Sequence, residues 1–92
     1  MTESHSVYIL ECGDGSYYTG YTTDIERRVA EHRGGDGAKY TRGRTPLTVV
    51  YCEHFATRSA AMSREARIKQ MTRTEKERLV GSTDTPGDYV EG

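Results

Sequence analysis

The fold is set by residues 6–33, SVYILECGDGSYYTGYTTDIERRVAEHR, in which two short strand-like runs precede a helical pattern. Residues 7–12 form a mainly apolar run, and residues 16–21 are aromatic and polar. Between them, Gly-Asp-Gly at residues 13–15 is typical of a tight turn. This order predicts a β-hairpin.

The length of the hairpin turn decides whether two tyrosines can act together. A connection of three residues would place Tyr8 opposite Gly20. Leu10 would then lie opposite Tyr18, so that the two tyrosine side chains share one face of the sheet. A two-residue loop would put Tyr8 and Tyr18 on opposite faces, because side chains alternate along a strand.

The helical pattern that follows has clear ends. Residues 22–24, Thr-Thr-Asp, supply oxygens for the N-cap, and the glycines at 34–35 end the helix at about Arg33. At about 100° per residue, Ile25 and Val29 define the buried stripe of this helix.

The basic side chains of the same helix are separated by its geometry. Arg28 and His32 fall on one edge of the buried stripe, whereas Arg27 points toward solvent. Arg28 can therefore reach a site beside the core, although Arg27 is its direct neighbour in the sequence.

After this helix, residues 34–46 (GGDGAKYTRGRTP) form a glycine-rich loop. Its basic residues are interleaved with a tyrosine, a composition that suits contacts to a nucleic-acid backbone and an exposed base. The candidates for DNA binding are three residues of this loop and one further lysine, namely Lys39, Arg42, Arg44 and Lys69.

The second half of the chain predicts one strand and two helices. Residues 47–53 (LTVVYCE) are β-branched and almost continuously apolar, so we expect this strand at the centre of the sheet. A helix is predicted over residues 59–70, with Thr57 or Ser59 as its N-cap, and a shorter one over residues 74–80.

The longer of these helices carries an inward-facing carboxylate. Ala61, Met62 and Ile68 mark its apolar face, and Glu65 projects between them. Burying an unpaired carboxylate costs several kcal/mol, as an order of magnitude, so Glu65 needs a partner. An ion pair with an arginine is the ordinary structural solution, and a metal ion is the functional one.

Length and composition limit the organisation of the chain. Ninety-two residues predict one domain over residues 1–81, followed by an acidic, mobile tail over residues 82–92. Residues 1–6 do not resemble a signal peptide, and no apolar run is long enough to cross a membrane, so we expect a cytoplasmic, soluble protein. Cys12 and Cys52 are expected to be reduced thiols in apolar surroundings.

The net charge is −1, but the charged residues are unevenly distributed along the chain. All 13 lysines and arginines lie within residues 27–78, together with only six acids, which gives this segment a net charge of +7. A basic segment of this size is expected where a protein binds phosphates. The alternative is a pair of solvated helix faces.

At these residues the chain resembles a GIY-YIG nuclease domain, of the small stand-alone bacterial and archaeal kind. The first motif is Val-Tyr-Ile at residues 7–9, and the second is Tyr-Thr-Gly at residues 18–20. Arg28 follows the second motif by eight residues, His32 follows by four more, and Glu65 lies on a later helix.

The resemblance covers residues 7–81 and includes three departures. Val7 stands where the name of the family has glycine, and Thr19 where it has isoleucine. Tyr21 stands where some relatives, including the excision-repair nuclease, have a lysine. The first two leave the functional side chains in place, and the third removes a charge that would assist the reaction.

The resemblance implies an α/β (α+β) fold with a small three-stranded antiparallel sheet flanked by helices, and hydrolysis of DNA with one divalent metal. Glu65 would hold Mg²⁺ or Mn²⁺, and Arg28 would contact the scissile phosphate. Tyr18 would activate or orient the attacking water, with Tyr8 and His32 assisting. His32 titrates near neutrality and is the rival general base.

The leading hypothesis is therefore a metal-dependent DNA endonuclease, acting in DNA repair or on branched or single-stranded DNA. DNA is the expected partner, with no membrane and no small-molecule cofactor, and a protein partner would supply specificity. The alternative is a catalytically weak nucleic-acid-binding module of the same fold. A protein-interaction domain that uses the acidic tail is a third alternative. The enzyme is favoured because binding alone needs no inward carboxylate.

Overall fold

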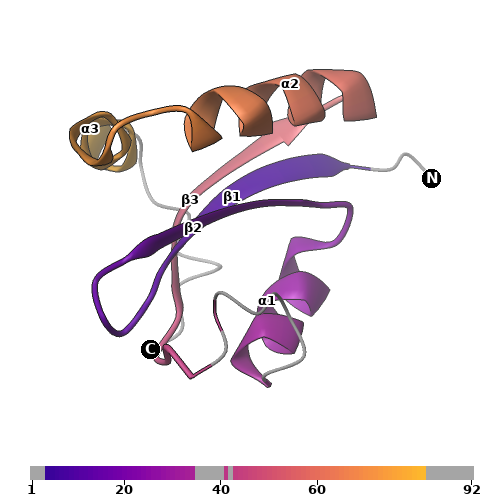
Figure 1. The fold of residues 1–92 in the computed structure, drawn as a ribbon. Helices are drawn as coiled ribbons and strands as arrows, with labels where there is room; N and C mark the ends of the chain where they lie inside the picture. The colour runs from indigo at the N-terminus through magenta and orange to yellow at the C-terminus, as the bar shows by residue number, and fades with distance from the viewer. Residues whose placement is uncertain (1–3, 35–40, 42, 83–92) are drawn as a thin grey trace.

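The computed structural model describes residues 4–34, 41 and 43–82, and Figure 1 shows a small sheet with helices on both faces. Its elements in chain order are β1 (His5–Glu11), β2 (Tyr17–Thr22), α1 (Ile25–Arg33), β3 (Thr48–Phe55), α2 (Arg58–Lys69) and α3 (Arg73–Ser82). The sheet has three strands and is antiparallel throughout, so the predicted fold class is confirmed. The tail is predicted to begin at Ser82, which is still part of α3, and residues 83–92 lie outside the described residues.

The central strand is β1, because the order of the sheet is β2-β1-β3. Residues 7–10 of β1 are completely buried. The prediction that residues 47–53 form the central strand is wrong, since β3 lies at an edge. Its apolar run has another cause: Val49 packs in the cluster beneath α1, and Tyr51 packs in the cluster beneath α2. A strand covered on both faces is apolar on both faces, wherever it lies in the sheet.

The β1–β2 hairpin has the register that a three-residue turn predicts. Tyr8 lies opposite Gly20, and Leu10 lies opposite Tyr18. The amide of Cys12 donates to the carbonyl of Ser16 at 2.8 Å and closes the turn. Tyr8 and Tyr18 therefore share one face of the sheet.

Each face of the sheet carries its own apolar cluster. Tyr8, Leu10 and Val49 pack against α1 on one face. On the other face, α2 covers the cluster of Val7, Ile9, Tyr51, Ala61 and Ile68. Figure 1 shows α1 on one side of the sheet and α2 with α3 on the other. The alternation along β1 thus sends Tyr8 toward α1.

The helices begin and end close to the predicted positions. Asp24 caps α1 by accepting from the amide of Arg27 at 3.1 Å, and Thr57 caps α2 by accepting from the amide of Ala60 at 3.1 Å. Met62 is 37% exposed and does not belong to the buried face of α2, so this part of the prediction is wrong. In the described part of the chain, no helix is long and apolar enough to cross a membrane.

Candidate active site

Tyr8 and His32 form the buried centre of the candidate site. The hydroxyl of Tyr8, on β1, lies 2.9 Å from Nε2 of His32, in the last turn of α1. The ring centroid of Tyr18, on β2, lies 5.2 Å from that of His32 and 6.4 Å from that of Tyr8. Three of the five predicted catalytic residues therefore pack as one aromatic cluster on the α1 face of the sheet.

Gly20 makes room for this cluster. A Cβ atom built at Gly20 would lie 2.6 Å from Cζ of Tyr8 and 3.1 Å from Cε2 of Tyr18. The Tyr8 ring thus lies directly over the backbone of β2, where only glycine leaves space. Gly20 is the hairpin partner that a three-residue turn predicts for Tyr8, and the structure supplies the steric reason for the glycine of the second motif.

Arg28 lies beside the aromatic cluster with 32% of its side chain exposed. Its guanidinium lies close enough to the hydroxyl of Tyr8 to lower the pKa of Tyr8, and its Nη1 donates to Oε1 of Glu31 at 3.0 Å. Glu31 also pairs with Arg27, at 3.4 Å between Nε and Oε2. The role of Glu31 was missed in the sequence, where its spacing of three and four residues from the arginines was the available signal. Arg28 thus reaches the site with its charge already compensated.

Tyr8 is protonated at neutral pH. Burial raises the pKa of Tyr8 to about 12, and the Arg28 guanidinium offsets this only in part. The charges of Tyr18 and Glu65 act in the same direction as burial. In this environment Tyr8 is a hydrogen-bond donor at neutral pH, rather than a base.

His32 is neutral and is held by a residue that sequence analysis missed. Burial lowers the pKa of His32, and the charge of Arg28 lowers it further, whereas Glu31 opposes the shift. Nδ1 of His32 lies 2.9 Å from Oγ1 of Thr41, and both residues are 1% exposed. Thr41 lies in the glycine-rich loop, where a polar residue gives no sign of burial.

The lowered pKa of His32 predicts a stability that rises with pH. An unfolded histidine has a pKa of about 6.5, so between the folded-state pKa and about 6.5 the unfolded chain binds more protons. Stability is complete above this window and is lost as the pH falls through it. We expect the melting temperature to fall between pH 7 and pH 5, and the His32 ring to titrate below 6.5 by NMR.

His32→Gln and His54→Gln separate this effect from general acid sensitivity. We expect His32→Gln to flatten the pH dependence of melting and His54→Gln to leave it close to that of the wild type. Equal profiles for the wild type and His32→Gln would show that another group governs the acid transition.

The contacts of Glu31 predict that its removal strengthens DNA binding. In Glu31→Gln, the guanidinium groups of Arg27 and Arg28 lose their carboxylate and become available to phosphates. The salt dependence of binding should steepen by roughly 0.7–0.9 units of slope for each arginine that gains a phosphate contact. The measurement is fluorescence anisotropy of labelled DNA at several salt concentrations.

Glu26→Gln is the matched control for Glu31→Gln. Glu26 is exposed, lies in the first turn of the same helix, and its substitution changes the net charge equally. We expect a clearly smaller change in slope for Glu26→Gln. Identical slopes for the two variants would mean that Glu31 does not restrain the arginines.

Glu65 reaches inward from α2, as predicted, and its side chain is only 12% exposed. It pairs with Lys69 of the same helix, at 3.2 Å between Oε2 and Nζ, rather than with an arginine. The charge of Glu65 adds a minor contribution to the raised pKa of Tyr8. The described residues contain no group of three or more His, Cys, Asp or Glu that could hold a metal ion. Glu65 is thus a single inward carboxylate on α2, the helix that covers the face of the sheet opposite α1.

The predicted DNA-binding residues fall into two groups. Arg44 pairs with Asp14 in the hairpin turn, and Lys69 pairs with Glu65, while the side chains of Arg44 and Lys69 remain 40% and 55% exposed. Both cations are exposed, so a phosphate can compete for them, and an exposed pair such as Arg44–Asp14 contributes only about 0–1 kcal/mol. Lys39 and Arg42 lie outside the described residues.

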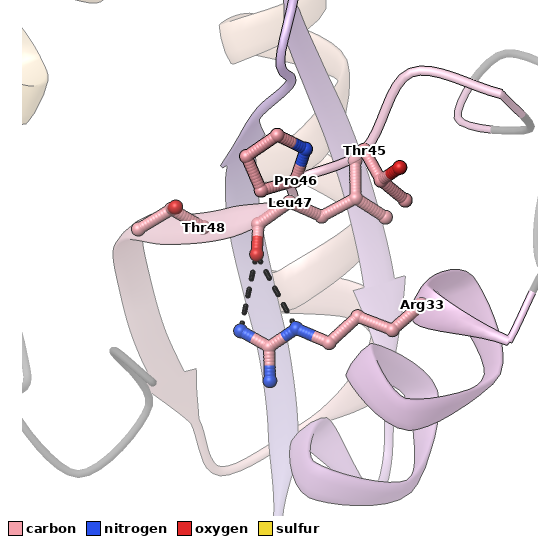
Figure 2. Close-up of a pocket in the computed structure, with 5 residues that line it drawn as sticks. All are labelled: Arg33, Thr45, Pro46, Leu47 and Thr48. Carbon is pink, nitrogen blue, oxygen red and sulfur yellow. Dashed lines mark hydrogen bonds between the residues drawn. The ribbon is translucent and has the colours of Figure 1, made fainter. Parts of the chain in front are cut away.

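A pocket at the end of α1 is separate from this cluster. Figure 2 shows Arg33 reaching toward the start of β3, where its Nη2 and Nε donate to the carbonyl of Leu47 at 3.1 and 3.3 Å. The pocket is lined by Arg33, Thr45, Pro46, Leu47 and Thr48. None of the predicted site residues that the structure describes lines it. This contact ties α1, which carries Arg28 and His32, to the sheet.

A family model described as the GIY-YIG catalytic domain matches residues 4–78. A UPF0213 protein of Halobacterium salinarum is 65% identical over 75 residues, which cover 82% of this chain and 97% of that protein. A UPF0213 protein of Halalkalibacterium halodurans is 51% identical over 83 residues, which cover 90% of this chain and 88% of that protein.

Two solution NMR structures are similar to this one. The UPF0213 protein from Bacillus halodurans has a TM-score of 0.61 and 49% identity, with 94% of this chain and 92% of that chain covered. A protein from E. faecalis has a TM-score of 0.62 and 47% identity, with 88% and 86% covered. Both comparisons extend over nearly the whole length of each chain.

Proposed function

Since this chain belongs to the GIY-YIG family, a nuclease superfamily, we propose that it is a divalent-metal-dependent DNA endonuclease. The observation that carries the proposal is the contact between Tyr8 and His32, with Arg28 on the same hydroxyl. Polar groups that are completely buried in so small a domain must be paired, and a simpler core would use apolar side chains here. The presence of the buried Tyr8 and His32 polar groups beside the partly exposed Arg28 supports a role for them in catalysis.

In the proposed reaction, Arg28 binds the scissile phosphate. Its guanidinium exchanges Glu31 for two phosphate oxygens and stabilises the charge that develops as water attacks. The exchange is feasible because 32% of the Arg28 side chain is already exposed. Arg28 keeps its contact with Tyr8, so the phosphate is positioned against the aromatic cluster.

The position of each aromatic residue favours Tyr18 over His32 as the group that faces the attacking water. Nε2 of His32 is occupied by the Tyr8 hydroxyl, and His32 is 1% exposed. Tyr18 is half-buried and stands at the edge of the same cluster. We assign Tyr18 to orient the water, and Tyr8 with His32 to hold a fixed hydrogen-bond network behind it.

Glu65 would hold the divalent metal, Mg²⁺ or Mn²⁺. A hard cation of this kind takes one or two carboxylates and completes its shell with waters and substrate phosphates. A single inward carboxylate whose ion-pair partner among the described residues is a half-exposed lysine fits this pattern. When bound, the metal supplies neutralisation of charge on the phosphate and the leaving oxygen.

DNA is the proposed substrate, and Lys39, Arg42, Arg44 and Lys69 are proposed to contact its backbone. Such contacts position a duplex without reading its sequence, so specificity for damaged, branched or single-stranded DNA in repair would come from shape or from a protein partner. A nucleic-acid-binding module without turnover is the alternative. It would bind the same DNA and leave it intact.

The experiment that tests the function uses the full chain with labelled duplex, single-stranded and branched DNA. Each substrate is incubated with Mg²⁺, Mn²⁺ or EDTA, and Arg28→Ala serves as the inactive comparison. Cleavage that requires metal and Arg28 supports the endonuclease. Tight binding with no cleavage under any condition would favour the binding module, and neither binding nor cleavage would contradict both.

A further inference from the structure

Both ring nitrogens of His32 have protein partners in the interior. The Tyr8 hydroxyl lies 2.9 Å from Nε2, and the Thr41 hydroxyl lies 2.9 Å from Nδ1. Tyr8 is 0% exposed, and His32 and Thr41 are each 1% exposed. A histidine held in this way has a defined tautomer, because each nitrogen must either donate or accept.

The direction of these hydrogen bonds follows from Arg28. A guanidinium can only donate, so the Arg28 guanidinium, which lowers the pKa of Tyr8, favours an orientation in which the hydroxyl proton of Tyr8 points away from it. The single hydroxyl proton of Tyr8 then goes to Nε2 of His32. In the reverse arrangement Nε2 would donate to the Tyr8 oxygen. The hydroxyl proton of Tyr8 would then lose Nε2 as its acceptor in a fully buried contact. Neutral His32 consequently carries its proton on Nδ1 and donates it to Thr41.

The hairpin turn holds Thr41 in position. The amide of Arg44 donates to the carbonyl of Thr41 at 3.2 Å, and the Arg44 guanidinium pairs with Asp14 in the turn. The amide of Gly13 donates to the carbonyl of Arg44. A Cβ atom at Gly13 would lie 2.7 Å from the carbonyl carbon of Thr45, so the turn and the loop pack in close contact. Thr41 therefore contacts His32 from a segment that hydrogen bonds hold against the hairpin turn.

We propose that Thr41 is a positioning residue that holds His32 as the Nδ1–H tautomer and so keeps Nε2 as the acceptor of the Tyr8 hydroxyl. Its effect on cleavage rests on the proposed function, whereas the tautomer itself does not. Without the Thr41 hydroxyl, Nδ1–H loses its acceptor and the Nε2–H tautomer becomes competitive. Nε2–H would turn the Tyr8 hydroxyl away and disturb its contact with Arg28.

The test compares Thr41→Val, which keeps the shape and removes the hydroxyl, with Thr41→Ser, which keeps the hydroxyl. Long-range ¹H–¹⁵N NMR of the His32 ring reports the tautomer directly. We expect Nδ1–H in the wild type and in Thr41→Ser, and an increased share of Nε2–H in Thr41→Val. With DNA and Mg²⁺ or Mn²⁺, kcat should fall about 10- to 100-fold in Thr41→Val with little change in KM, and recover in Thr41→Ser.

The outcomes separate this proposal from the proposed function. An Nε2–H tautomer in the wild type, or an unchanged Nδ1–H tautomer in Thr41→Val, would overturn the role of Thr41. If Thr41→Val does not fold, the test rests on the other two proteins. An Nε2–H tautomer in the wild type or in Thr41→Ser would then overturn the role of Thr41. If the tautomers behave as expected but no form cleaves DNA, the positioning role stands and the endonuclease is contradicted.

Discussion

Replacing Glu65 by glutamine is expected to reduce DNA cleavage at least ~100-fold, because even groups that only support a metal ligand contribute 10- to 100-fold. The amide keeps the size and polarity of the side chain but loses the anionic oxygen that a hard divalent cation requires. DNA binding, measured by anisotropy in EDTA, should remain close to that of the wild type. Cleavage is measured by nicking of labelled DNA across a range of Mg²⁺ and Mn²⁺ concentrations.

The fold of Glu65→Gln should survive, and the ion pair explains why. Lys69, the partner of Glu65, is 55% exposed, so losing the pair leaves a cation that water can solvate. Screened pairs of this kind contribute about 0–1 kcal/mol, whereas a buried arginine left unpaired would cost about 3–5 kcal/mol. We therefore expect a melting temperature lowered by no more than about 8 °C.

Lys69→Gln is the matched control, since it breaks the same ion pair and keeps the carboxylate. We expect Lys69→Gln to retain cleavage, with weaker binding of DNA, and to melt below Glu65→Gln because it leaves the largely buried carboxylate unpaired. Undiminished cutting by Glu65→Gln would exclude Glu65 as the metal ligand. Equal loss of cutting in both variants would assign the effect to the ion pair.

The hairpin was predictable because its register depends on local features. A Gly-Asp-Gly turn fixes which residues face each other, and strand alternation then places Tyr8 and Tyr18 together. The central strand was not predictable in the same way. The apolar run of residues 47–53 indicates that helices bury both faces of this strand. Burial of both faces occurs in central strands and in edge strands, so it does not tell them apart.

Within the site, the predictable residues are those that repeat on one helix edge or one strand face. Arg28 and His32 follow from helical geometry, and both lie at the aromatic cluster. Thr41 could not be found in this way, because its burial depends on how a long loop returns to the hairpin turn. The spacing of Glu31 from Arg27 and Arg28 could have predicted ion pairs along the helix. Its effect on Arg28, however, depends on where both side chains lie.

Gly20→Ala is expected to lower both stability and cleavage, because a methyl group has no space beneath Tyr8. The added Cβ would lie 2.6 Å from Cζ of Tyr8, whose ring is fully buried and hydrogen-bonded to His32. The ring must move, and overpacking of this kind costs about 1–3 kcal/mol. We expect the melting temperature to fall by roughly 4–20 °C and cleavage by about 100-fold, the effect of a displacement near 1 Å in an active site.

Two controls show whether the contact with Tyr8 is the cause of the Gly20→Ala effect. Gly81→Ala makes the same change in α3, where a Cβ meets nothing within 4 Å, so its melting temperature should be unchanged or higher. Tyr8→Phe removes the hydroxyl that lies nearest to the new methyl group. In a double-mutant cycle, Gly20→Ala should therefore destabilise Tyr8→Phe less than it destabilises the wild type. Strict additivity would show that the alanine acts on β2 itself and that the glycine of the second motif does not serve the tyrosine.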